Sequence, residues 1–224
     1  MYILAFDTTA NACNVCLVKD KKVIAKFCKE MEFGQAEELL PAIKNILDGE
    51  HILMSDLSAI AVCTGPGSFT GVRACISAAR TFSFALPECT IFGVSAFDAY
   101  INGLEEQEVA PINAVIIETK RNDFYCQLFD KDKKKISEPM AAEYDDIIAL
   151  LRGNKVSLIG DGVKRFLSKP SGLSLHAIKI ERGLSCEALS ACAIRKLEDK
   201  IFDFPKPLYI KAPDLGPKNQ KNFG

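Results

Sequence analysis

The chain has 224 residues, of which 48% are hydrophobic, so it is long enough to bury the core of one large domain or two small ones. Its formal net charge of −1 at pH 7 argues against a dedicated nucleic-acid-binding surface. The sequence opens without a basic segment and apolar core, and no apolar run approaches the roughly 20 residues of a membrane span. We therefore expect a cytoplasmic protein with no membrane partner.

The cysteine pattern favours reduced thiols. The nine cysteines are scattered and odd in number, which suits the cytosol better than a disulfide framework. Cys13 and Cys16 form a C-x-x-C motif, but they fall in a predicted strand, where residues three apart point to opposite faces. We interpret them as buried, unpaired thiols, in preference to a redox or metal site.

The first half of the chain predicts a strand meander followed by alternating helices and strands. A charged turn at residues 19–22 separates the second and third strands. The predicted order is strand 2–6, strand 12–18, strand 23–28, helix 36–47, strand 57–63, helix 72–86, strand 90–94 and helix 96–102.

The second half repeats this order after an acidic, polar linker at residues 102–111. The predicted elements are strand 112–117, strand 124–130, strand 135–139, helix 144–151, strand 156–159, helix 163–167, strand 175–178 and helix 186–197. Short charged turns favour antiparallel pairs, and helical crossovers imply parallel pairs. Two such units in tandem predict an α/β protein of actin-like ATPase architecture.

A glycine-rich turn at residues 63–73 connects a predicted buried strand to a predicted helix. Gly65, Gly67 and Gly71 permit close backbone approach, and Ser68 or Thr70 can cap the helix. The spacing matches neither a P-loop, nor a dinucleotide fingerprint, nor a serine-hydrolase elbow. A free helix N-terminus also suits an anion, but we favour a structural turn whose glycines serve helix–strand packing.

The same turn resembles the signature of the TsaB (YeaZ) family, the bacterial relatives of the TsaD/Kae1 proteins. Further similar segments are residues 3–9 (ILAFDTT), 35–41 (QAEELLP), 92–98 (FGVSAFD), 118–125 (ETKRNDFY) and 207–211 (PLYIK). Gln35 and Ala36 depart from the usual His-Ser-Glu helix start. The resemblance implies the ASKHA fold with two tandem RNase H-like subdomains. We place them at residues 1–104 and 105–204, with a partly disordered tail at 205–224.

The nucleotide cleft expected of this fold is present only in reduced form. Actin-like ATPases hold Mg²⁺ and phosphates with acidic and glycine-containing turns. The turns after Asp7 and Glu118 contain no glycine, and the turn at residues 160–162 lacks the longer glycine run. The cleft remnants are Asp7, Thr8, Thr9, Glu118, Gly160 and Gly162. We expect no cofactor, with weak or interfacial ATP or ADP as the alternative. Asp7 alternatively caps a turn.

The histidine content argues against a metal site. The resemblance places Ala96 and Tyr100 where TsaD relatives have the His-x-x-x-His that binds a catalytic metal. The only histidines, His51 and His176, lie far apart in sequence. Isolated histidines without clustered carboxylates do not build an ordinary zinc or iron site, nor a catalytic triad. We predict no metal and no catalytic residue.

The helix at residues 72–86 is apolar nearly all round, and Arg73 and Arg80 are its only charges. Such a helix is buried on every side, either between a sheet and a neighbouring helix or against a partner. The resemblance implies that helices 36–47 and 72–86 pair with the same helices of TsaD, or of a second TsaB. The interface residues expected on this basis are Leu39, Ile43, Val72, Ile76, Ala79 and Arg80.

The resemblance implies a non-catalytic but required subunit of the complex that forms threonylcarbamoyladenosine on tRNA, next to the anticodon. Its partners would be TsaD, TsaE and, through the complex, tRNA, with a homodimer when the chain is alone. The tail lysines are interpreted as ordinary solvated charge. The alternative, from a different class, is a small-molecule kinase or ATPase of the actin-like fold.

Overall fold

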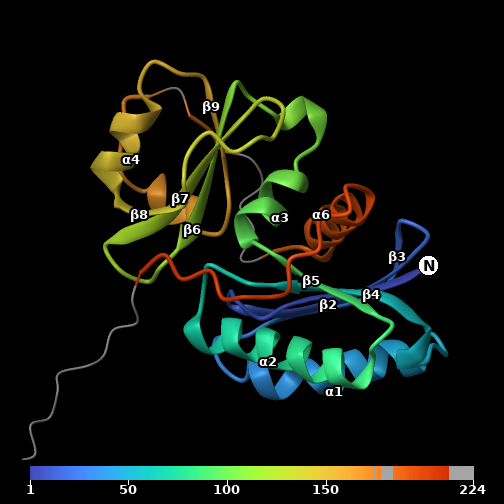
Figure 1. The fold of residues 1–224 in the computed structure, drawn as a ribbon. Coiled ribbons are helices and arrows are strands. Elements are labelled where there is room, and N and C mark those ends of the chain that lie inside the picture. Colours follow the sequence, from blue (N-terminus) through green and yellow to red (C-terminus); the bar gives the residue numbers. More distant parts are fainter. Residues whose placement is uncertain (174, 178–183, 212–224) are drawn as a thin grey trace, which may run out of the picture.

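The computed structural model describes residues 1–173, 175–177 and 184–211. Two β-sheets lie one above the other, with helices between them and on their outer faces (Figure 1). A long extended segment after the last helix passes beside the first sheet and reaches the second. The two halves of the chain therefore meet along a shared middle layer.

The first sheet has the order β3-β2-β1-β4-β5. β1 pairs antiparallel with β2, which pairs antiparallel with β3, whereas β1–β4 and β4–β5 are parallel. The strand bounds are β1 Tyr2–Asp7, β2 Ala12–Lys19, β3 Lys22–Glu30, β4 Leu57–Cys63 and β5 Thr90–Val94. The predicted meander and parallel extension of the first half are confirmed.

The second sheet repeats this topology with the order β10-β9-β6-β7-β8. β6–β7 and β7–β8 are antiparallel, and β6–β9 and β9–β10 are parallel. The strand bounds are β6 Ile112–Glu118, β7 Asp123–Asp130, β8 Met140–Glu143, β9 Val156–Ile159 and β10 Leu175–Ala177. The equivalence of the two sheets confirms the tandem architecture.

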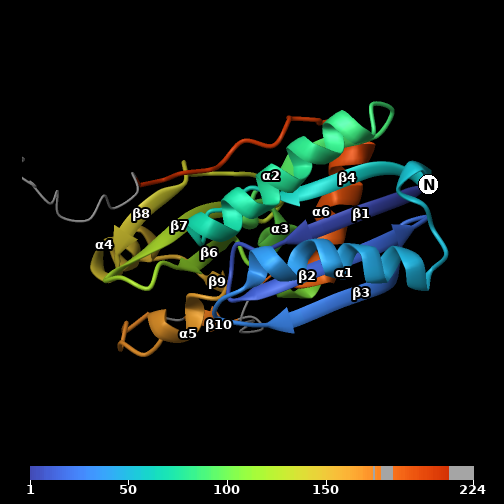
Figure 2. The ribbon, with the colours of Figure 1, turned by 90° about the horizontal axis from the view of Figure 1, so that it is seen from below.

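Three pairs of helices cover these sheets. α1 (Gln35–Gly49) and α2 (Phe69–Ala85) lie side by side on one face of the first sheet (Figure 2). α3 (Ala96–Asn102) and α6 (Cys186–Glu198) lie in the middle layer, and α4 (Tyr144–Leu151) and α5 (Val163–Phe166) pack on the second sheet. Two short 3₁₀ turns, η1 (Met54–Asp56) and η2 (Glu106–Glu108), complete the elements.

The middle layer is a single apolar core shared by both halves. Ile3 of β1, Phe97 of α3, Ile117 of β6 and Leu189 of α6 are all nearly inaccessible and belong to one cluster. α6 follows the second sheet in sequence but packs against the first sheet and α3. A core shared by both halves does not mark a boundary between them. The domain limits at residues 104 and 204 therefore stay a prediction.

The structure changes some predicted bounds. The strand predicted at residues 135–139 is wrong, because β8 begins at Met140. The preceding residues cross β7 irregularly, since Ile136 donates to the Leu128 carbonyl and Ser137 Oγ accepts from the Leu128 amide. Ile178, the predicted end of the last strand, lies outside the described residues. So does most of the tail, although residues 205–211 are described and extended.

No helix in the described ranges is both long and apolar enough to cross a membrane.

Candidate functional site

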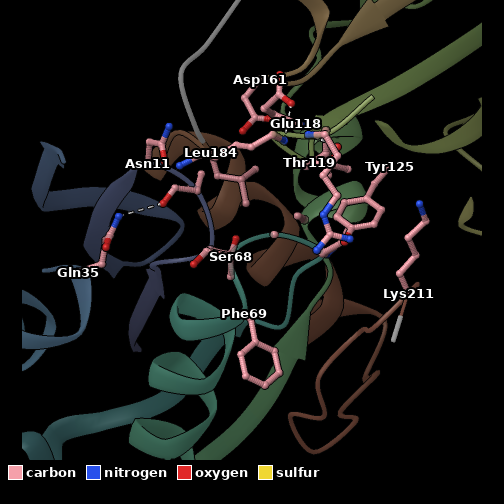
Figure 3. A pocket seen from close by; sticks show the side chains of 18 of the residues that line it. Asn11, Gln35, Ser68, Phe69, Glu118, Thr119, Tyr125, Asp161, Leu184 and Lys211 are labelled. Atoms are coloured by element: carbon pink, nitrogen blue, oxygen red, sulfur yellow. Dashed lines mark hydrogen bonds between the residues drawn. The ribbon is translucent and has the colours of Figure 1, made fainter. Parts of the chain in front are cut away.

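A cavity of about 260 Å³ lies where the two halves meet. The ends of β1 and β6, the start of α2 and the extended C-terminal segment contribute its walls. Figure 3 shows Asp161, Glu118 and Thr119 on one side of the cavity and Ser68 on the other, with the Phe69 ring directed away. Asn11, Gln35 and Leu184 lie on the remaining side of the view.

The glycine-rich turn forms one wall and packs directly on the end of β1. The Ser68 amide donates to the Thr9 carbonyl at 2.6 Å, and Thr8 Oγ1 donates to the Gly71 carbonyl at 2.8 Å. A Cβ added at Gly71 would lie 1.8 Å from the Thr8 carbonyl oxygen, and one at Gly67 would lie 2.3 Å from that of Thr9. These two glycines therefore permit helix–strand packing, as predicted, and Gly65 has a φ of +88°.

Ser68 is the residue that caps α2. Its Oγ accepts from the Gly71 amide at 3.3 Å, and the helix begins at Phe69, three residues earlier than predicted. The cap occupies a helix N-terminal amide that an anion would otherwise use.

Asp7 caps the turn that follows β1. Its Oδ1 accepts from the Thr9 amide at 2.8 Å and from Thr9 Oγ1 at 2.7 Å. The carboxyl group is fully buried and its Oδ2 has no partner within the described residues. Burial raises the pKa of Asp7 above its ordinary value, against the lowering effect of these hydrogen bonds. The carboxyl group does not line the cavity, so it is not placed to bind a magnesium ion there.

Glu118, at the end of β6, is held by an arginine. Arg165 donates to both carboxylate oxygens of Glu118 at 2.7 Å, a bidentate pair. Burial opposes ionisation of Glu118, but the hydrogen bonds from Arg165 and the Lys120 amide outweigh it and hold its pKa below the ordinary value. Thr119 is similarly engaged, because its hydroxyl donates to the Asp123 carbonyl at 2.6 Å.

The remaining predicted cleft positions, Gly160 and Gly162, are structural. A Cβ at Gly160 would lie 2.2 Å from the Ile116 carbonyl oxygen, and Gly162 donates its amide to that same oxygen. Between them, Asp161 lines the cavity and accepts from the Glu118 amide at 3.0 Å. Burial raises the pKa of Asp161 to about 7.

These residues do not fit magnesium–nucleotide binding. Phosphates need free backbone N–H groups, and Mg²⁺ needs an ionised carboxylate that reaches the cavity. Of the six predicted positions, Thr9 and Glu118 line the cavity, while Asp7 and Thr8 are buried beneath it. Glu118 is already paired with Arg165. No phosphate-binding step is assigned to this site.

Ala96 and Tyr100 both line the cavity, one turn apart on α3. Neither side chain ligates a metal as a histidine does. Residues 1–173, 175–177 and 184–211 contain no group of three or more His, Cys, Asp or Glu side chains that would hold a metal ion.

Five of the six predicted interface residues face inward, which corrects that prediction. Leu39 and Ile43 of α1 and Ala79 of α2 are buried in the cluster between the two helices and the first sheet. Val72 and Ile76 are also at most 4% exposed. The apolar stripe of each helix thus belongs to the chain's own core, and only Arg80 is exposed.

The outer face of α1 and α2 presents other residues. Leu40 is 55% exposed and Phe84 is 90% exposed, and Phe33, just before α1, is 82% exposed. Arg73, Ser77 and Arg80 are exposed on α2 between Phe69 and Phe84. Arg73 lies over the Phe69 ring, 5.2 Å from its centroid. We call the set Leu40, Phe69, Arg73, Ser77, Arg80 and Phe84 the outer helical face.

The sequence reasoning missed the C-terminal segment as a part of the cavity. Leu208 donates its amide to the Thr64 carbonyl, Tyr209 stacks on Phe69 at 5.6 Å, and Lys211 pairs with Asp123. The segment therefore connects the first half with the second. The segment at residues 207–211, which resembles the TsaB family, was the one sequence signal here. No local pattern indicates which strand this segment contacts.

Comparison with solved structures agrees with the class that this topology defines, the actin-like ATPase fold. YeaZ from Pseudomonas aeruginosa superposes with a TM-score of 0.79 at 20% identity, covering 93% of this chain and 99% of that one. An activator of 2-hydroxyisocaproyl-CoA dehydratase from Clostridium difficile, with bound ADPNP, has a TM-score of 0.51 at 8% identity, covering 89% and 95%.

Sequence comparison is more specific. The family model described as "TsaD: tRNA N6-adenosine threonylcarbamoyltransferase" matches residues 34–202. The tRNA threonylcarbamoyladenosine biosynthesis protein TsaB of Buchnera aphidicola is 30% identical over 188 residues, covering 80% of this chain and 86% of that protein. Escherichia coli TsaB is 31% identical over 138 residues, covering 61% and 58%. The chain belongs to the TsaB family. This membership supports a role in tRNA threonylcarbamoyladenosine biosynthesis.

Proposed function

We propose that this chain is a non-catalytic, required subunit of the complex that forms threonylcarbamoyladenosine on tRNA, and that it holds TsaD in its active arrangement. The observation that carries the proposal is the contrast between the cavity and the outer helical face. The acidic groups expected to handle a nucleotide are buried or paired. The outer helical face instead leaves large apolar side chains in solvent.

The outer helical face has the composition of a protein interface. Exposed Leu40, Phe69 and Phe84 supply apolar area, and Arg73 and Arg80 supply the charged donors that interfaces favour. Small Ser77 lies between the arginines and permits close helix approach. Both helices lie on the side of the first sheet away from the second half (Figure 1), so a partner would reach them from outside. Of the outer helical face, Phe69 at the start of α2 also lines the cavity.

The same face accounts for the other expected partners. Two copies of the chain would meet through it in a homodimer when TsaD is absent, because a two-fold interface uses one patch twice. TsaE, and tRNA through the complex, are the further partners that we propose. The net charge of −1 suits contact with tRNA through the complex and not by this chain alone.

A pull-down with the TsaD of the same genome tests the proposal. Leu40→Glu and Phe84→Glu each put an unpaired charge in the interface, so we expect capture of TsaD to fall at least about tenfold. Leu150→Glu on α4 is the matched control, because Leu150 is 48% exposed but lies on the second sheet. If Leu40→Glu and Phe84→Glu both captured as much TsaD as the wild-type chain does, the result would contradict the proposal.

The substitutions Ile76→Glu and Ala79→Glu, which the sequence alone would suggest, do not test the interface. Both side chains are buried in the free chain, at 4% and 0% exposure. Burying an unpaired charge there would unfold the chain, and loss of TsaD binding would follow for that reason.

A further inference from the structure

We propose that Cys28 and Cys186 form a reversible disulfide when the protein meets a peroxide, so that the pair is a redox modification site. The two sulfur atoms are 3.3 Å apart, although the residues are 158 positions apart in sequence. Cys28 lies on the edge strand β3, and Cys186 is the first residue of α6. A disulfide bond of about 2.05 Å needs the sulfurs to approach by little more than 1 Å.

The two thiols differ in their exposure to solvent, and this difference determines which one reacts with peroxide first. Cys28 is exposed, whereas Cys186 is fully buried behind it. A peroxide therefore reaches Cys28 first. Its sulfur attacks the peroxide oxygen, the O–O bond breaks, and one water leaves, which gives a sulfenic acid at Cys28. Cys186 then attacks that sulfur, the S–O bond breaks, and a second water leaves. Overall two thiols and one hydrogen peroxide give one disulfide and two waters.

The surroundings of Cys186 hold its sulfur in place for the second step. Its sulfur also lies 3.5 Å from the Val15 carbonyl oxygen, and its own carbonyl lies 3.5 Å from Cys16 Sγ. Cys16 is in turn engaged with Ser190 Oγ at 3.1 Å and is fully buried. Cys186 thus has one exposed thiol neighbour, Cys28, with which to exchange.

The pair is reduced and slow to react at rest. The hydrogen bond to Cys186, followed by burial, raises the pKa of Cys28 above its ordinary value, and the hydrogen bond to Cys16 raises that of Cys186. The positive charge of Lys26 opposes this rise in the pKa of Cys28, while the negative charge of Glu187 on α6 reinforces it. Because thiolates are the reactive species, we expect oxidation of this pair to be slower than that of a thiol with an ordinary pKa.

The bond would fasten α6 to the edge of the first sheet. α6 belongs to the second half by sequence and packs in the middle layer between α3 and the first sheet. The disulfide would close a loop across most of the chain, which restricts the unfolded state strongly. We therefore expect the oxidised protein to have a Tm higher by roughly 5 °C or more.

The test is hydrogen peroxide treatment of the full chain, alkylation of remaining thiols, proteolysis and mass spectrometry. We expect a cross-linked peptide pair containing Cys28 and Cys186, with loss of two of the nine thiols and recovery by dithiothreitol. Cys28→Ser and Cys186→Ser should each lower the cross-linked fraction at least about tenfold. Cys89→Ser, at a half-buried cysteine elsewhere, is the matched control and should leave it unchanged.

Two results would overturn the proposal. One is full alkylation of Cys186 in oxidised wild-type protein whose Cys28 has become a sulfinic acid. The other is an equal loss of thiols in Cys28→Ser and wild type. Because Cys28 is exposed, its serine variant should fold, as circular dichroism would verify, so the outcome does not depend on the buried Cys186→Ser.

Discussion

Gly71 sets how closely α2 approaches the end of β1. A methyl group there would lie 1.8 Å from the Thr8 carbonyl oxygen, which forces the helix away from the strand. We expect Gly71→Ala to lower the free energy of unfolding by about 3 kcal/mol or more. Gly49→Ala is the control, because nothing lies within 4 Å of its added methyl group. Equal stability of the two variants in urea unfolding would show that the close approach is not needed.

Asp161 makes the stability of the protein depend on pH. Its pKa rises from 3.8 to about 7 on folding, so the folded state binds a proton more tightly than the unfolded state. The contribution to stability is therefore complete below pH 4 and is lost as pH rises through 7. We expect Asp161→Asn to be more stable than wild type by up to about 4 kcal/mol at pH 8, and equal to it near pH 4. Urea unfolding at pH 4 and pH 8 measures both proteins, and equal stability of the two at pH 8 would contradict the prediction.

At the scale of the element, two adjacent leucines of α1 separate folding from binding. Leu39 is 1% exposed and packs on the first sheet, whereas Leu40 is 55% exposed. We expect Leu39→Ala to cost about 3 kcal/mol of stability, and Leu40→Ala to cost no more than about 0.5 kcal/mol. Thermal unfolding measures both. A large loss in Leu40→Ala would mean that this side of the helix is part of the core.

The elements themselves were largely predictable, but their faces were not. Helical periodicity locates α1 and α2, yet a periodic apolar stripe is the side that a chain buries in its own core. For that reason Leu39 and Ile43 were the wrong choice for a partner interface. A single exposed apolar residue such as Phe84 lies outside the periodic apolar stripe, so helical periodicity does not identify it as part of an interface. The strand predicted at residues 135–139 failed because its alternation is interrupted by irregular pairing with β7.

The candidate site was predictable only where a turn motif fixed it. The spacing of the glycines in the turn at residues 63–73 predicted its packing role, because glycine allows two backbone segments to come close together. The Glu118–Arg165 pair joins residues 47 apart within the second half, and the Lys211–Asp123 pair joins residues 88 apart, so both depend on long-range packing. No local sequence signal specifies such contacts.

For the whole molecule, the paired and buried acidic groups predict weak nucleotide binding. Isothermal titration of the isolated chain with Mg-ATP should give no dissociation constant tighter than about 1 mM, because Asp7 is fully buried and Glu118 is paired with Arg165. A micromolar value would favour the alternative of an active kinase of this fold.

The central claim is that this chain acts through TsaD and not by its own chemistry. The most direct measurement is the yield of threonylcarbamoyladenosine on tRNA, by mass spectrometry, in a reconstituted system from the same genome. We predict product only when this chain and TsaD are both present, and at least about tenfold less with Leu40→Glu than with Leu150→Glu. Product formed by this chain without TsaD, or an undiminished yield with Leu40→Glu, would contradict the account.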